Sequence, residues 1–397
     1  MCTILRAVIS RGLLATVAVT ATLTCHLGMA ERATVSDQTS RRLLEAVAER
    51  GYHETALLIL DRLAADPELS AEFRRTIPLR RAAALVASVR FDPDLAKRRQ
   101  TYADAAAEID RLLATGDDPA VVAEAAMQRG LLLLEQGRLR RLTDDSAGAA
   151  AAAKLFGKAA AAFVAGADAG PASGSARAAT ERELAAVDAR LMEYRKRRVL
   201  PREDRRACDA LEAERERLRG RLVQLDLLAA EATAEQARCF PTGSAARQSG
   251  LKRAAGQYRA IAEKQPTRAA GLWARVEEGR TLIELGERER GLELLDEILK
   301  LPATEILIER LQVRALAATL QCWLETPDQR DDAGFDERLR RQVLGLGPPE
   351  RLDADALDAK YAAAELLLRR VEEIPLGEQR RRQPLVEDVR RLATDVA

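Results

Sequence analysis

One stretch decides the fold, Leu251–Pro302, and it reads LKRAAGQYRAIAEKQPTRAAGLWARVEEGRTLIELGERERGLELLDEILKLP. Its apolar side chains recur every three or four residues, which is the period of an amphipathic helix, and Pro266 and Gly286 interrupt that pattern. The repeated positions of its second half are Gly279, Leu282, Gly286, Gly291, Leu295 and Ile298. The stretch therefore predicts helices joined by short turns, with small residues where neighbouring helices cross.

The same pattern occurs in two other parts of the chain. One copy consists of Gly130, Leu133 and Gly137, which repeat the spacing of Gly279, Leu282 and Gly286 residue for residue. The other copy consists of Gly51, Ala56, Leu60, Leu63 and Pro67. Because these segments are far apart in the sequence, their shared spacing indicates repeated helix pairs.

Composition favours an all-α protein. Ala, Leu, Arg and Glu fill the periodic segments, and these residues lose little free energy on entering a helix. A length of 397 residues allows two or three domains or one long solenoid. The 63 basic and 62 acidic residues balance, so no net field attracts the chain to nucleic acid or to an anionic membrane. We therefore expect no nucleic-acid partner.

The spacing of small and large residues resembles that of the tetratricopeptide repeat (TPR) family, whose unit is a pair of antiparallel helices about 34 residues long. The resemblance implies a TPR-like solenoid that holds other proteins or peptides. In this family the first helices of successive pairs line a concave groove. The groove positions that the resemblance implies around Gly279 are Trp273, Val276, Arg280, Ile283 and Glu284. Around Gly130 they are Glu124, Met127, Leu131, Leu134 and Glu135.

An alternative interpretation places the apolar members of this set in the core between helices. For Trp273 the two interpretations have about equal weight, and for Leu131 and Leu134 the core is favoured. The resemblance gives no sign of the cationic clamp by which some family members hold a carboxylate, because Arg41 and Glu45 occupy the corresponding positions of the first pair.

The first thirty residues differ in kind from the rest. Arg6 and Arg11 precede an apolar run without acidic residues, Gly12–Leu23, and the small residues of Gly28–Ala30 follow it. This order is typical of a signal peptide at residues 1–30, which predicts export to the periplasm or to the outside of the cell. A buried first helix and an uncut membrane anchor are the alternatives. After removal of the signal we expect no membrane span.

Beyond the signal the sequence predicts four segments. Residues 31–165 form N-terminal TPR-like repeats, residues 166–176 a linker rich in Gly, Ser and Pro, and residues 177–240 a long helical hairpin. Residues 251–397 form C-terminal TPR-like repeats, which we expect to continue beyond this chain because the apolar stripe of 379–396 has no covering helix.

The hairpin prediction rests on a seam of the coiled-coil type, with apolar residues that step by three and four on both sides of Pro201. It predicts two helices of about 23 and 36 residues that fold back on each other, and it allows self-association through this arm or through the C-terminal helix.

Few residues are available for catalysis or metal binding. Without the signal the chain keeps three widely spaced cysteines, Cys208, Cys239 and Cys322, and one histidine, His53. This set predicts neither a disulfide framework nor a metal site, and no pattern indicates a cofactor.

Three functions remain open from the sequence. The first is a non-catalytic exported scaffold that mediates protein–protein interactions in the bacterial cell envelope. The second is an exported helical-solenoid enzyme that acts on cell-wall glycan through two carboxylates, which spacing alone cannot select. The third is a structural coiled-coil spacer whose helical arm is the functional part.

Overall fold

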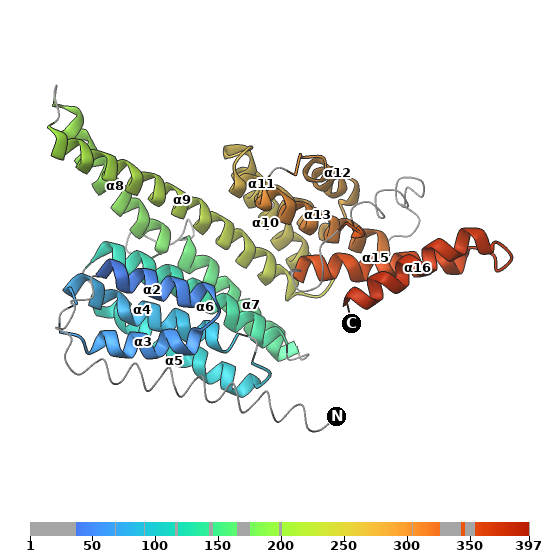
Figure 1. Ribbon diagram of the computed structural model, residues 1–397, viewed down its shortest axis with the longest axis horizontal. Helices are drawn as coiled ribbons and strands as arrows, with labels where there is room; N and C mark the ends of the chain where they lie inside the picture. The colour runs from blue at the N-terminus through green and yellow to red at the C-terminus, as the bar shows by residue number, and fades with distance from the viewer. Residues whose placement is uncertain are drawn as a thin grey trace, which may run out of the picture. The chain divides into compact units, whose positions relative to one another are not determined.

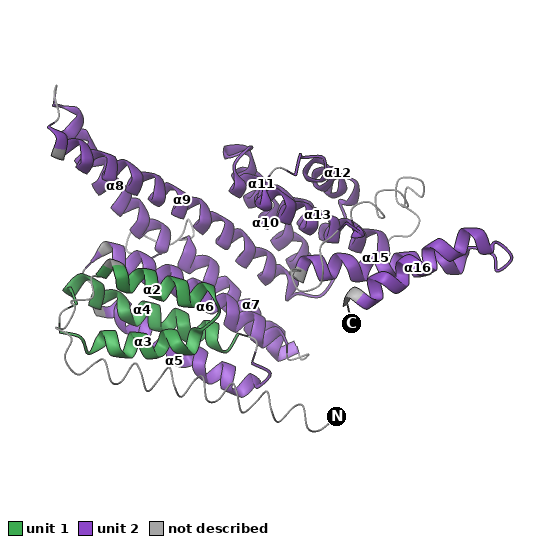
Figure 2. Ribbon diagram, viewed as in Figure 1, with its two compact units in different colours: residues 1–91 green, residues 92–397 purple. Residues whose placement is uncertain are grey.

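The computed structural model describes residues 37–67, 69–90, 92–115, 118–142, 146–164, 175–197, 201–303, 305–325, 343–345 and 354–396. Within these ranges the chain forms fourteen helices and no strand, which confirms the predicted all-α class (Figure 1). It divides into two compact units, residues 1–91 and 92–397 (Figure 2). The predicted signal peptide, 1–30, and most of the predicted linker, 166–176, lie outside the described residues.

The first unit contains α2 (Asp37–Glu49), α3 (His53–Ala64) and α4 (Ala71–Ser88), each packed on the next. Gly51 ends the turn between α2 and α3 with a φ of 75°, a conformation that glycine adopts without strain. Ala56 and Leu60 of the predicted pattern are buried against Leu44 and Phe73, so the predicted helix pair is present.

The second unit begins with α5 (Leu95–Thr115), α6 (Pro119–Arg141) and α7 (Ser146–Phe163). Ten of the 18 residues of helix α7 are alanine, and its two phenylalanines are fully buried against α6. The Phe163 ring packs on Gly130 and the Phe156 ring packs on Gly137, where a Cβ would lie 2.6 Å from a ring carbon. The glycines at this spacing therefore let two rings fill the space between the helices.

A long helix, α9 (Arg202–Arg238), forms the middle of the second unit and follows α8 (Ala176–Arg195). They are 37 and 20 residues long, against the predicted 36 and 23, and the two helices lie side by side (Figure 1). The predicted seam pairs them through Val187, Leu191, Leu211 and Leu218. Farther along α9, Leu225, Ala229 and Ala232 pack instead with α6 and α7, so only the first part of α9 belongs to the arm.

The chain after α9 continues in short antiparallel steps. The helices are α10 (Ala245–Lys264), α11 (Ala269–Leu285), α12 (Arg288–Leu299), α13 (Ile306–Glu325), α15 (Ala354–Glu373) and α16 (Gln379–Val396). Helix α11 packs on α10 and α12, its neighbours in sequence, and also on α9 and α13. It crosses α12 at Gly279 and Gly291, where a Cβ on Gly291 would lie 2.7 Å from the Gly279 carbonyl oxygen. The small residues of the opening stretch therefore stand where the helices cross, as the pattern predicts.

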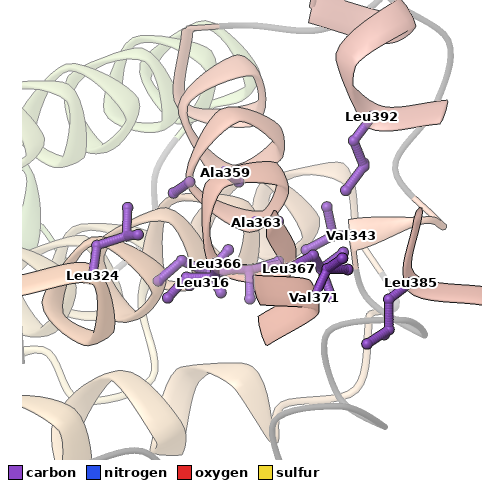
Figure 3. Packing of buried hydrophobic residues seen from close by; sticks show 12 residues of the cluster. Leu316, Leu324, Val343, Ala359, Ala363, Leu366, Leu367, Val371, Leu385 and Leu392 are labelled. Atoms are coloured by element: carbon purple, nitrogen blue, oxygen red, sulfur yellow. The ribbon is translucent and has the colours of Figure 1, made fainter. Parts of the chain in front are cut away.

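The last core of the chain lies between α13, α15 and α16 (Figure 3). Leu366 and Leu367 of α15 are buried there, next to Leu316 of α13. Leu385 and Leu392 of α16 are also buried in this cluster, although the sequence analysis leaves the apolar stripe of 379–396 without a covering helix. The difference arises because α15 is apolar on more than one side and covers α16 itself.

All three cysteines in the described part of the chain are free thiols. Cys208 and Cys239 lie near opposite ends of α9, about 46 Å apart at a rise of 1.5 Å per residue, whereas a disulfide needs Cα atoms within about 7 Å. Thiol counting on a chain without residues 1–30, unfolded without reductant, should therefore find Cys208, Cys239 and Cys322 all reactive.

In the folded protein Cys322 should react slowest because its side chain is only 1% exposed. Burial also raises the pKa of the Cys239 thiol, which slows its reaction near neutral pH. A disulfide between Cys208 and Cys239, mapped by mass spectrometry, would contradict the continuous α9.

Candidate functional site

The second unit has a cavity of about 320 Å³ between α11, α13 and α15. Its α11 side is formed by Arg280, Ile283 and Glu284, three of the residues that the sequence analysis places in a groove. The remaining lining residues are Arg314, Ala317, Ala318, Gln321, Cys322 and Glu325 of α13 and Asp355, Asp358 and Tyr361 of α15. Charged side chains and a few apolar ones, Ile283, Ala317 and Ala318, therefore line the same hollow.

Arg314 joins the three helices around this cavity. Its Nε donates to Oε1 of Glu277 on α11 at 2.5 Å, and its Nη1 donates to Oδ2 of Asp355 on α15 at 2.7 Å. Arg280 lies 3.4 Å from the same Glu277 oxygen. Burial alone would raise the pKa of the Glu277 carboxyl, but Arg280 and Arg314 outweigh it and lower this pKa below its ordinary value. Glu277 is therefore held as a buried carboxylate.

Trp273 lies on the same helix as Glu277, one turn earlier. Its side chain is 37% exposed, and the guanidinium carbon of Arg314 lies 4.7 Å from the centre of its ring. This is the geometry of a cation–π contact, which fixes the ring without covering it. The structure thus places a partly exposed aromatic side chain against an arginine that lines the cavity.

A second hollow of about 430 Å³ adjoins the first, because both are lined by Ile283, Glu284 and Glu325. It extends toward the start of α10, where Arg247 lines it. The Glu284 carboxylate lies 2.6 Å from Arg238 of α9 and 3.8 Å from Arg247. The two hollows therefore adjoin along α11 and the end of α13, and together we call them the groove; α10, α11, α12, α13 and α15 contribute its lining residues.

Ion pairs extend this charged layer from α11 through α9 to α6. Arg238 bonds Glu235 at 2.9 Å, Glu235 also pairs with Arg141 of α6, and Glu231 pairs with Arg138 of α6. Burial alone would lower the pKa of Arg238, but Glu284 and Glu235 more than compensate and raise it. Opposite charges therefore alternate between neighbouring helices, and they hold α6, α9 and α11 in register.

The other predicted groove residues are used inside the protein. Val276 is fully buried, and Met127 is buried in the core between α6 and α7. Glu124 pairs with Arg221 of α9 at 2.8 Å, and Glu135 pairs with Arg138 at 2.6 Å. Of the predicted residues, Arg280, Ile283 and Glu284 line the groove, whereas Trp273 lines neither hollow and contacts the lining residue Arg314. The α6 residues lie elsewhere.

The sequence pattern does not reveal the α13 and α15 side of the groove. Helices α13 and α15 lack the glycine pattern that tells which face of α11 points to the groove. The lining residues missed for this reason include Arg314, Asp355, Asp358 and Tyr361. Asp358 and Glu325 make no salt bridge with any residue that the structure describes. One signal was available, since Leu357, Tyr361 and Leu368 recur at the spacing of a helical stripe.

Within the described ranges no group of three His, Cys, Asp or Glu side chains is placed to hold a metal ion. None of the described helices is both long enough and apolar enough to cross a lipid bilayer. Comparisons with protein-family models, with curated proteins and with solved structures found no match to this chain.

Proposed function

We propose that this chain is a non-catalytic, TPR-like helical-repeat scaffold whose groove along α11, α13 and α15 binds other proteins. The observation that carries the proposal is the groove itself, with Trp273 partly exposed and stacked on Arg314 at its edge. Ordered aromatic and arginine side chains at a concave surface are the composition that dominates binding energy in protein interfaces.

Two observations support a TPR-like solenoid. Helix α11 contacts α9 and α13 as well as α10 and α12, so helices two steps apart in sequence lie next to each other. The α11–α12 crossing at Gly279 and Gly291 uses the small residues that the repeat pattern requires. We infer that α9, α11, α13 and α15 form the layer that faces the partner.

We also propose that the protein is exported, with partners in the bacterial envelope. The support for this part is the sequence of residues 1–30, in which two arginines precede an apolar run and small residues follow.

Trp273→Ala tests the proposal. The side chain is partly exposed, so the substitution should lower the free energy of unfolding by about 1–2 kcal/mol, below the 3–5 kcal/mol typical of a fully buried tryptophan. As an interface anchor it should weaken binding by about 2 kcal/mol, or about 30-fold in Kd. The measurement is quantitative mass spectrometry of proteins captured from envelope extract by immobilised wild type and by the variant, followed by titration of the captured partner.

Tyr52→Ala is the matched control, because Tyr52 is an aromatic side chain that is 60% exposed in the first unit. It should leave both capture and affinity unchanged. A large fall in melting temperature for Trp273→Ala together with unchanged capture would show that Trp273 is a core residue and would contradict its role in partner binding.

A further inference from the structure

Helix α15 has three apolar side chains on one side that are exposed. Leu357, Tyr361 and Leu368 are 37%, 60% and 48% exposed, and Ala364, between the last two, is partly buried at the edge of the core. Their spacing of four, three and four residues is that of a coiled-coil seam. The opposite side of the helix, with Ala359, Ala363 and Leu366, is already buried in the core of Figure 3. The exposed stripe is therefore additional to what folding of this chain requires.

Acidic residues follow one edge of this seam. Asp358, Glu365 and Glu372 are spaced by seven residues, so each occupies the heptad position directly after a d position of the seam. Glu365 pairs with Arg369 at 2.7 Å, whereas Asp358 and Glu372 make no salt bridge with any described residue. Asp358 and Tyr361 also line the cavity, so this acidic seam begins at the edge of the groove.

The charges decide which partner fits. If two copies of α15 paired in antiparallel fashion, the three acidic positions of one helix would face those of the other, and like charges would repel. If they paired in parallel, the acidic positions would face Lys360 and Leu367, but both side chains are buried in the core and offer no cation at the surface. Pairing between two copies therefore leaves the acidic edge without partners.

We propose that the exposed face of α15 binds an amphipathic helix of another protein, in which Lys or Arg flanks the apolar seam. This inference rests on the proposed scaffold function and names the chemistry of its partner. The apolar seam supplies buried area, and the row of Asp358, Glu365 and Glu372 selects a basic helix over an acidic one.

Two synthetic peptides of about 21 residues, or three heptads, test the proposal. Both carry Leu at the seam positions, and one carries Lys where the other carries Glu beside the seam. Fluorescence anisotropy with the chain lacking residues 1–30 should show that the Lys peptide binds at least about tenfold more tightly than the Glu peptide at about 50 mM salt. The difference should shrink at about 300 mM salt because exposed charges are screened.

Charge reversal on α15 tests whether its acidic residues cause the preference for the Lys peptide. Asp358→Lys/Glu365→Lys/Glu372→Lys should reverse the preference between the two peptides. The matched control, Glu289→Lys/Glu293→Lys/Glu309→Lys, makes the same change in net charge at exposed positions of α12 and α13 and should keep the preference. Leu368→Glu should remove binding of the Lys peptide, with circular dichroism and melting temperature showing that the fold is retained.

Equal binding of both peptides to the wild type, or a preference that survives reversal on α15, would overturn the proposal. A wild-type dimer in light scattering that Leu368→Glu converts to a monomer would assign the face to a second copy. Failure of the proposed function is visible separately, because capture through Trp273 from extract does not depend on these peptides.

Discussion

Glu277→Gln is expected to lower the free energy of unfolding by about 3 kcal/mol, which is within the range for removing one partner from a buried ion pair. Glu277 is 6% exposed, and its carboxylate is the common acceptor of Arg314 and Arg280. Glutamine keeps the shape but cannot neutralise the two guanidinium groups. Urea unfolding followed by circular dichroism measures the difference.

The stability difference between wild type and Glu277→Gln should depend on pH, which identifies the negative charge of Glu277 as its cause. The folded protein lowers the pKa of Glu277, so the stabilisation is fully present above the ordinary value of about 4.5 and is lost as the pH falls below it. The gap between wild type and Glu277→Gln should therefore close in acid.

Glu297→Gln is the matched control, because Glu297 pairs with Arg275 at 2.5 Å but is 54% exposed. It should cost at most about 1 kcal/mol. Equal losses for Glu277→Gln and Glu297→Gln would show that burial of the ion pair contributes nothing.

Gly137→Ala is expected to destabilise the protein by about 2–3 kcal/mol. The new methyl group would lie 2.6 Å from the Phe156 ring, which is fully buried, so the ring or the helix must shift. The double variant Gly137→Ala/Phe156→Leu should recover part of the loss because the smaller side chain makes room. Thermal and urea unfolding of the three proteins provide the comparison.

Gly220→Ala is the control, and its effect should have the opposite sign. Gly220 lies inside α9 with no atom within 4 Å of an added Cβ, so alanine should stabilise the helix by about 0.5–1 kcal/mol. Stabilisation by Gly137→Ala as well would show that the close contact between α6 and α7 is not needed.

The sequence predicts those parts of the fold that depend on local spacing. The apolar seam on both sides of Pro201 predicts two long helices there, and the Gly130 and Gly137 spacing predicts a close crossing, since both signals act within one helix or between sequence neighbours. The charged layer could not be predicted in this way. Arg138 and Glu231 are 93 residues apart. The sequence contains many other arginines and glutamates, and nothing in it favours this pair over the others.

The groove could be predicted only on its α11 side. Gly279 and Gly286 mark the side of α11 that packs on its neighbour, and so they predict which of its residues face the groove: Trp273, Arg280, Ile283 and Glu284. Helix α15 has no glycine of this kind. Because α15 carries apolar residues on both the Leu366 side and the Tyr361 side, periodicity alone does not tell which side is buried. That choice depends on tertiary packing with α13 and α16.

The continuity of α9 determines how the second unit loses structure. In a linear array of repeats each pair can open alone, because it contacts only its neighbours. Here one helix shares its side chains with α8 through Leu218, with α6 and α7 through Leu225, and with α10 through Ala230 and Ala234. Opening either flank removes support from the same 37 residues, so we expect the arm, the α6–α7 pair and the first helices after α9 to unfold as a single cooperative block.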